Sequence, residues 1–432
     1  MVAMVVVVAA GVGGAGAAGR RAVLAAAGGW SALGVRRGRH AFAWGANDGA
    51  AIGTGVSSAF TDRPQPMLQQ GPTQQREGIL LRPASLAAGV SHTLFVPKEN
   101  PHEVWGLGLN TSGQLGTSLK KVLAAPTRLL TCDAPIKALA AGHEHSMVLT
   151  EDNEIWGAGL SSQQQLGVVQ SEPYDWTTLS DVFAASLDTP IAHWSSLACG
   201  ASHSVLLGQD QNQRAVVVTS GCNADGQAGP RPTLGDSDVL APPGLLFGTA
   251  HASDTLSIAA GTDHTIIVER TLEGTRLWGT GNNEYGQLAQ DPEAQDRLME
   301  LGLLMTLSPE ETVQQVACSG SCTYVLIDGQ VRRSGLDVQG PHVGFVPLQL
   351  PETDLRFRFI AANSMAFAAV DMQGQLWTMG AGHLAAHGHS TGPVDALTCL
   401  LNQEACQVFE GAKQVQDVVL GHDFGFAILD SQ

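Results

Sequence analysis

The sequence predicts an all-β fold, a seven-bladed β-propeller. Two observations predict it: a short glycine-containing pattern recurs along the chain, and a second pattern follows nearly every copy at a similar interval. Such a period marks a repeat architecture, in which each unit buries its apolar face against its neighbours. The composition agrees, because 51 glycines and only 15% charged residues suit short strands joined by tight turns.

The first pattern consists of two small residues, Gly, two variable residues, His, then Ser or Thr before an apolar run. Four copies are intact: Gly89 with His92, Gly142 with His145, Gly200 with His203, and Gly261 with His264. Three later copies have lost the histidine, at Cys322, Ala366 and Phe424. The recurrence of histidine at one repeat position indicates a side chain that ties neighbouring strands together by hydrogen bonds.

The second pattern is Trp-Gly-x-Gly, Asn, then Gly-Gln-Leu-Gly. Clear copies start at Trp105, Trp156 and Trp278, a shorter copy starts at Trp44, and weaker copies start at Val218, Arg332 and Trp377. Short polar turns at 151–153, 272–274, 328–329 and 372–374 separate the two patterns within a unit. An apolar strand, a tight turn and a second apolar strand predict a β-hairpin.

The two ends of the repeat region each hold half a unit. The chain enters the repeats with the lone Trp44 strand and leaves them with the lone Gly421 strand. We expect these strands to pair and close the ring, which removes its open edge. The predicted propeller therefore spans residues 41–432, preceded by a leader over residues 1–40.

The leader has a distinct composition. No acidic residue precedes Asp48, whereas five arginines lie between Arg20 and Arg39 among many alanines and glycines. This pattern is typical of an organelle transit peptide. Two alternatives stay open: residues 1–19 could form an apolar anchor or signal, or the segment could be an unstructured extension without a targeting role.

The doublet of patterns resembles the regulator of chromosome condensation repeat family over residues 42–430. Within that family the chain is most similar to the mitochondrial members, which pair a transit peptide with a strand like the one at residues 104–110. The resemblance implies a seven-bladed propeller in the mitochondrial matrix, with peripheral association with the inner membrane as an option. It implies no cofactor.

The resemblance also implies a function. Mitochondrial relatives are linked to ribosomal RNA, so the first hypothesis is a non-enzymatic scaffold that supports assembly of the large ribosomal subunit through rRNA and protein assembly factors. The alternative is a guanine-nucleotide exchange factor for a mitochondrial GTPase of inner-membrane fusion. The founding member has an Asp in its first-blade turn, and Asp48 falls at the matching place, although it could be an ordinary turn residue. A scaffold for respiratory-complex assembly is a third option.

The charge pattern limits nucleic-acid binding to local patches. The net charge of −17 argues against binding through bulk charge, and no basic tail for chromatin or DNA follows Asp48. Two basic clusters are candidates for RNA contact, with solvated surface charge as the alternative. They are Lys120, Lys121 and Arg128, and Arg332, Arg333, Arg356 and Arg358.

Linkers between repeats offer candidate protein contacts. Residues 168–196 include Tyr174 and Trp176, an aromatic pair expected to be exposed to a partner. Residues 291–305 predict a short helix that begins at Asp291-Pro292-Glu293 and carries an acidic face.

No metal site and no enzyme motif is predicted. The spacing of His383, His387 and His389 matches no structural zinc pattern. The sequence also lacks a nucleophile elbow, a phosphate-binding loop or a dinucleotide fingerprint in a credible context. Seven dispersed cysteines, an odd number, indicate free thiols in a reducing compartment.

Overall fold

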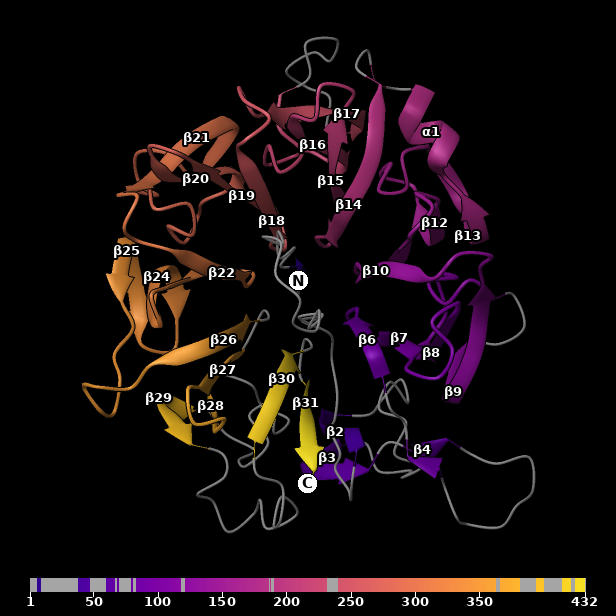
Figure 1. Cartoon of the computed structure of the whole chain (residues 1–432), viewed down its shortest axis with the longest axis horizontal. Coiled ribbons are helices and arrows are strands. Elements are labelled where there is room, and N and C mark those ends of the chain that lie inside the picture. Colours follow the sequence, from indigo (N-terminus) through magenta and orange to yellow (C-terminus); the bar gives the residue numbers. More distant parts are fainter. Residues whose placement is uncertain are drawn as a thin grey trace.

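The structure, a computed structural model, describes residues 6–8, 38–46, 60–66, 68–69, 79–80, 83–117, 121–185, 187, 190–230, 240–362, 366–380, 394–399, 414–420 and 424–431. Four-stranded antiparallel sheets stand around a central axis, with the first strand of each blade innermost (Figure 1). The all-β propeller predicted from the repeats is confirmed.

Three blades occupy the first half of the ring. The first contains β6 (Pro83–Ala88), β7 (His92–Pro97), β8 (Glu103–Leu109) and β9 (Val122–Thr131). The second contains β10 (Ile136–Ala141), β11 (His145–Thr150), β12 (Ile155–Ser161) and β13 (Gln170–Thr178). The third contains β14 (Ile191–Cys199), β15 (His203–Asp210), β16 (Ala215–Cys222) and β17 (Leu240–Gly248).

Three further blades follow in the same order. The fourth contains β18 (Thr255–Ala260), β19 (His264–Thr271), β20 (Gly274–Asn282) and β21 (Arg297–Leu307). The fifth contains β22 (Val313–Cys318), β23 (Cys322–Ile327), β24 (Gln330–Asp337) and β25 (Gly340–Pro347). The sixth contains β26 (Phe357–Ala362), β27 (Ala366–Asp371), β28 (Leu376–Gly380) and β29 (Val394–Cys399).

The prediction of seven repeated blades is wrong in its number, because six blades are built from four consecutive strands each. The strands nearest the two ends form a sheet of different construction, in the order β3-β2-β31-β30. Its members are β2 (Gly38–Ala46), β3 (Phe60–Pro66), β30 (Gln414–Leu420) and β31 (Phe424–Ser431). Strand β2, which contains Trp44, pairs with β31 near the C-terminus, and the count of patterns treated their sheet as a seventh repeated blade.

Short elements complete the described chain. Strand β1 (Val6–Val8) pairs with β18, and β4 (Leu68–Gln69) pairs with β5 (Ile79–Leu80). Helix α1 (Ser180–Ala185) links the second and third blades and buries Phe183. No helix in these described segments has the length and apolar character needed to cross a membrane.

The predicted hairpins are confirmed at all four polar turns, which join β11 to β12, β19 to β20, β23 to β24, and β27 to β28. The predicted helix over 291–305 is wrong. Turns fill residues 292–294, and β21 starts at Arg297, because Leu298 and Leu307 become buried when this segment pairs with β20.

The backbone conformation explains why the second glycine of the Trp-Gly-x-Gly pattern is present in every one of the six blades. The second glycine has φ between 101° and 151° in all six blades, a region that side chains with a Cβ rarely adopt. These residues are Gly108, Gly159, Gly221, Gly281, Gly335 and Gly380. The first glycine has no such requirement, and three blades replace it with Thr219, Arg333 or Thr378.

Each of the four repeat histidines is bonded to the next blade. His92 Nε2 lies 2.8 Å from Ser146 Oγ, and the other three make the same contact one blade further along the ring at 3.0 to 3.1 Å. Their partners are Ser204 for His145, Thr265 for His203 and Thr323 for His264. Ser146, Ser204 and Thr265 donate their own proton to a backbone carbonyl, so each accepts a proton from the imidazole Nε2.

Candidate functional site

The blades present two ends with different construction. Because the strands are antiparallel, the Gly-x-x-His turns and the connections from third to fourth strand lie at one end, which we call the turn face. The hairpin turns, such as 151–154, lie at the opposite end, which we call the hairpin face. Loops held on a rigid sheet are the usual location of binding residues, so the turn face is the first candidate.

The third-to-fourth connections of four blades are held by their own side chains. Asn110 Oδ1 accepts a hydrogen bond from the backbone N of Leu115 at 2.8 Å, and Gln114 Oε1 accepts one from Ser112 N at 3.0 Å. The same pair of contacts recurs with Ser161 and Gln165, Asn223 and Gln227, and Asn283 and Gln287. The turn face is therefore preformed.

Carboxylates from neighbouring blades gather on this face. Glu144 accepts a hydrogen bond from Ser112 Oγ of the preceding blade at 2.6 Å. Asp263 accepts one from Gln227 Nε2 at 3.3 Å. Burial, together with the nearby charges of Asp225 and Glu284, raises the pKa of Asp263 to about 6. One cation compensates part of this charge, because Arg297 lies 3.4 Å from Asp225.

The repeat histidines cannot serve this face as bases or charged groups. They are fully buried, and this burial lowers the pKa of His92, His145, His203 and His264 to about 3. The ring of each also lies against the glycine three residues earlier, where a Cβ would approach the imidazole to 2.0–2.1 Å. Their chemistry is that of neutral hydrogen-bond donors between blades.

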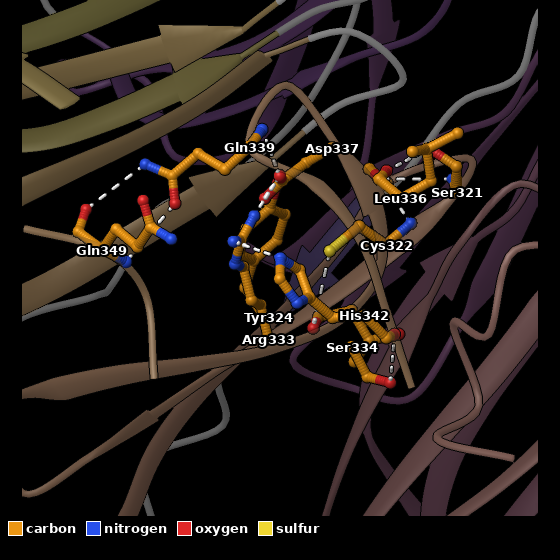
Figure 2. A network of polar contacts seen from close by, with 12 residues as sticks. Ser321, Cys322, Tyr324, Arg333, Ser334, Leu336, Asp337, Gln339, His342 and Gln349 are labelled. Atoms are coloured by element: carbon orange, nitrogen blue, oxygen red, sulfur yellow. Dashed lines mark hydrogen bonds and ion pairs between the residues drawn. The ribbon is translucent and has the colours of Figure 1, made fainter. Parts of the chain in front are cut away.

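The fifth blade departs from this plan at a buried charged cluster (Figure 2). Arg333 is 1% exposed and forms an ion pair with Asp337. Asp337 also accepts a hydrogen bond from Tyr324 Oη at 3.0 Å, and the Arg333 guanidinium donates to His342 Nε2 at 2.6 Å. Burial raises the pKa of the Tyr324 phenol, so the ring stays protonated and continues to donate.

The sheet register explains why an arginine is buried there. Arg333 occupies the position of the first glycine of the Trp-Gly pattern, equivalent to Gly106 in the first blade. A Cβ at Gly106 would meet Leu129 and Leu115, the latter from the third-to-fourth connection. In the fifth blade that connection is only residues 338–339, so it supplies no such leucine. The Arg333 side chain takes this space, and Asp337 balances its charge.

In the third blade, too, a side chain at the first-glycine position takes the place of a leucine from the connection, and both side chains are smaller. Thr219 stands at the first-glycine position, and the connection there supplies Ala228 in place of leucine. Thr219 Oγ1 donates to the Ala228 carbonyl at 2.6 Å. The volume at this position is therefore shared between a strand residue and a connection residue.

The structure does not bring the predicted RNA-binding arginines into one exposed patch. Arg333 is buried, Arg332 lies 3.3 Å from Glu311, and the Arg358 guanidinium donates to the carbonyl of Val415 in β30. Arg356 donates to the carbonyl of Leu355. Each of these four arginines has a partner within the protein.

In the other basic cluster, Arg128 pairs with Glu103 at 3.2 Å and Lys121 is exposed. Lys120 lies outside the described residues.

The aromatic pair of the 168–196 linker is divided. Trp176 is half-buried against Gly116 of the preceding blade, and its Nε1 donates to the Leu115 carbonyl at 3.2 Å. It therefore braces two blades. Tyr174 lies in β13 opposite Gly159.

The tryptophans of the repeat have carboxylate partners that the sequence patterns did not indicate. Trp105 and Trp156 donate to the glutamate two residues earlier, Glu103 at 2.8 Å and Glu154 at 3.1 Å. Trp278 donates to Glu269 and Trp377 to Asp371, both across a hairpin. An acid close to each Trp-Gly was the available signal. Trp44 lies in β2 opposite Gly425.

Several predicted positions lie outside the described residues, namely Asp48, Gly421, His383, His387 and His389. Among the residues that are described, no group of three His, Cys, Asp or Glu side chains is placed to hold a metal ion. The six described cysteines, Cys132, Cys199, Cys222, Cys318, Cys322 and Cys399, are free thiols.

Comparisons with known proteins match this geometry. The family model of the regulator of chromosome condensation (RCC1) repeat matches residues 102–149, and a second model of the same repeat matches residues 136–165. The RCC1-like G exchanging factor-like protein of Homo sapiens is 26% identical over 377 residues, covering 78% of this chain and 77% of that protein. Its Mus musculus counterpart is 25% identical over 375 residues, with 78% of each covered.

Solved structures show the same architecture. The crystal structure of human WBSCR16 superposes with a TM-score of 0.68 at 25% identity, covering 91% of this chain and all of that one. Prp20p from Saccharomyces cerevisiae superposes with a TM-score of 0.68 at 20% identity, covering 93% of each, which supports the fold. The chain therefore contains repeats of the regulator of chromosome condensation (RCC1) type and is similar to proteins built from them.

Proposed function

We propose that this chain is a mitochondrial protein-binding propeller that binds a GTPase on its turn face and promotes guanine-nucleotide exchange. Similarity to the human and mouse exchanging-factor-like proteins over 78% of the chain supports the proposal. The observation that carries it is the preformed turn face, where Glu144, Asp225, Asp263 and Glu284 come from four different connections.

The chemistry of exchange suits such a face. A GTPase holds nucleotide phosphates through backbone amides and a lysine of its phosphate-binding loop. Carboxylates presented by a rigid loop can compete with the phosphates for that lysine. A protein that binds the nucleotide-free state more tightly than the loaded state accelerates release by mass action, without a covalent step.

The alternative of ribosome assembly through rRNA has weaker support. Phosphate contacts require free cations. The described arginines of both candidate clusters are engaged by Glu103, Glu311, Asp337 or backbone carbonyls. We therefore propose a protein partner over an RNA partner.

Release of fluorescent GDP from purified mitochondrial GTPases tests the exchange function. We expect the full chain to accelerate release from at least one GTPase. Asp263→Asn and Glu144→Gln should reduce this acceleration, and Asp48→Ala tests the position predicted from the family. Glu151→Gln is the matched control, because Glu151 is exposed on the hairpin face. No acceleration with any GTPase, or equal loss in the control, would exclude exchange through the turn face.

The mitochondrial location is a proposal that rests on the acid-free, arginine-containing leader. Residues 1–47 fused to a fluorescent protein should direct it into mitochondria. A leader with the five arginines replaced by glutamine should not. Fluorescence that stays in the cytosol with the natural leader would contradict the location.

A further inference from the structure

The outermost strand of each blade is a sheet edge with free backbone groups, and most outer strands here are interrupted by proline. Proline removes an N–H donor and protects an edge from pairing with another chain. Prolines lie inside β9, β13, β17 and β25, at Pro126, Pro173, Pro242 with Pro243, and Pro341. Strand β29 has no proline but has only 6 residues.

Strand β21 is the exception, with 11 residues and no proline. It lies on the outer rim of the ring, where β20 is its only partner among the described strands (Figure 1). Its side chains are mostly apolar, with Glu300 as the one acidic residue. Met299 is 43% exposed and Leu303 is 47% exposed. Leu301, Leu304 and Met305 are half-buried beside them. The register with β20 shifts at two places, so the edge is kinked, and its length and exposed apolar side chains make it a template for strand addition.

Acidic residues bracket this edge at both ends. Asp291, Glu293 and Asp296 are exposed before β21, and Glu310 is exposed after it. The one arginine of the strand is already compensated, because Arg297 lies 3.3 Å from Asp296 and 3.4 Å from Asp225. An added strand therefore meets the exposed apolar side chains of Met299 and Leu303 with the exposed Glu300 between them, and negative charge at each end.

This charge pattern indicates which kind of molecule can pair with the outer edge of β21. A second copy of the chain in antiparallel pairing would bring Asp296 of one copy near Glu310 of the other, and in parallel pairing each acid would meet its own equivalent. Both arrangements oppose like charges, and the net charge of −17 on each copy adds to the repulsion. We propose that the outer edge of β21 binds an extended, proline-free segment of a partner protein, with alternating apolar residues flanked on both sides by Lys or Arg.

Binding of labelled peptides to the full chain, measured by fluorescence anisotropy, tests the proposal. The first peptide is as long as β21, with a core of alternating Val and Thr between lysine pairs. The second replaces the lysines with glutamates, and the third has one proline in the core. We expect the lysine-flanked peptide alone to bind, with an affinity that falls as salt rises.

Two variants locate the site. Leu303→Lys should weaken binding about tenfold or more, since it places a charge in the apolar centre of the edge. Val122→Lys is the matched control, because Val122 is 39% exposed on the proline-containing outer strand β9, and it should bind as the natural chain does. The double variant Asp291→Lys with Glu293→Lys should weaken the lysine-flanked peptide and strengthen the glutamate-flanked one. Circular dichroism shows whether each variant is folded.

Three results would overturn the proposal: equal binding of the proline-containing peptide, equal loss in Val122→Lys, or no binding of any peptide. Self-association of the natural chain that Leu303→Lys abolishes, seen by analytical ultracentrifugation, would replace the proposed partner with a second copy. The GDP-release assay is read with Leu303→Lys, because Leu303 lies within strand β21, whereas Asp291 and Glu293 lie in a turn-face connection.

Discussion

The first four blades and the last two join their neighbours by different chemistry. From β6 to β21 each blade is joined to the next by a buried histidine that is hydrogen-bonded to Ser or Thr. Between the fifth and sixth blades, Cys322 replaces the histidine, and the seam is held by Gln315. Its side-chain amide both donates to the Ile360 carbonyl at 2.7 Å and accepts from the Ile360 N at 3.0 Å.

The last two blades add an aromatic contact at the same seam, where the Tyr324 and Phe367 ring centroids are 4.5 Å apart. Each of the five seams between the six described blades therefore contains a buried polar contact, and different residues make it. Where a repeat has lost its histidine, other residues therefore make the contact between the two blades. Changes directed at each kind of seam can test this difference.

The largest expected difference between the two regions is in their response to acid. The four histidines have a pKa of about 3 in the fold, below the ordinary 6.5, so the unfolded chain binds more protons between these values. Stability is complete above pH 6.5 and is lost as pH falls toward 3, by up to about 5 kcal/mol per pH unit for four groups. Urea unfolding at several pH values measures this slope. His203→Gln should reduce this slope by the contribution of one titrating group, about a quarter of the total. An unchanged slope would contradict the lowered pKa of His203.

Within the last two blades, substitutions in the buried cluster of the fifth blade should lower stability the most. Asp337→Ala leaves the Arg333 charge buried without its carboxylate and should cost about 3–5 kcal/mol. The double variant Arg333→Met with Asp337→Asn removes both charges and should be more stable than Asp337→Ala. Denaturant midpoints compare the three proteins. A double variant with the summed cost of both single changes would show that the pair is not coupled.

Loss of one histidine contact should cost less than loss of the ion-pair partner. His203→Ala removes the hydrogen bond to Thr265 and leaves a cavity against Gly200, with an expected cost of about 2–3 kcal/mol. Gln315→Ala at the seam between the fifth and sixth blades removes a bidentate contact and should cost a similar amount. Thermal unfolding measures both. A negligible effect of Gln315→Ala would mean that apolar packing alone holds that seam.

Asp263 should show the opposite pH dependence from the histidines. Its folded pKa of about 6 lies above the ordinary 3.8, so its contribution is present below pH 3.8 and is lost as pH rises through 6. Asp263→Asn should therefore stabilise the protein by about 1 kcal/mol at pH 7, with a smaller effect at pH 4. Paired urea titrations at the two pH values provide the measurement, and an equal effect at both would contradict it.

The smallest effect should come from a surface pair of the fifth blade. Arg332 and Glu311 are both about one-third exposed, so Arg332→Gln should change stability by about 0–1 kcal/mol. The same denaturant assay applies. A cost comparable to that of Asp337→Ala would mean that Arg332 belongs to the buried cluster.

Much of the fold could be predicted because the repeat patterns encode local backbone requirements. The second glycine of Trp-Gly-x-Gly persists even in the decayed blades, since its positive φ is required in each of them. The hairpin turns followed from the polar residues between apolar runs. The candidate site was harder, because the charges of Arg332 and Arg358 were visible in the sequence while their partners Glu311 and Val415 lie in a loop and in another strand.

Two predictions were wrong for different reasons. The segment 291–305 carries apolar residues that suit a helix in isolation, but pairing of β21 with β20, which the local pattern does not indicate, makes it a strand. The count of seven blades treated the sheet shared by the chain ends as one more repeated blade, whereas that sheet, β3-β2-β31-β30, is not built from four consecutive strands.

The sequence by itself determined the repeated hairpins, the small residues at the inner strands and the histidines that recur at one position, because these follow from local geometry and period. Only the tertiary structure decided which cations are free and which edge is open. Arg333 is buried because a neighbouring connection is too short to supply a leucine, and β21 is exposed because no further strand follows it in its blade. Both depend on what lies across space from a residue.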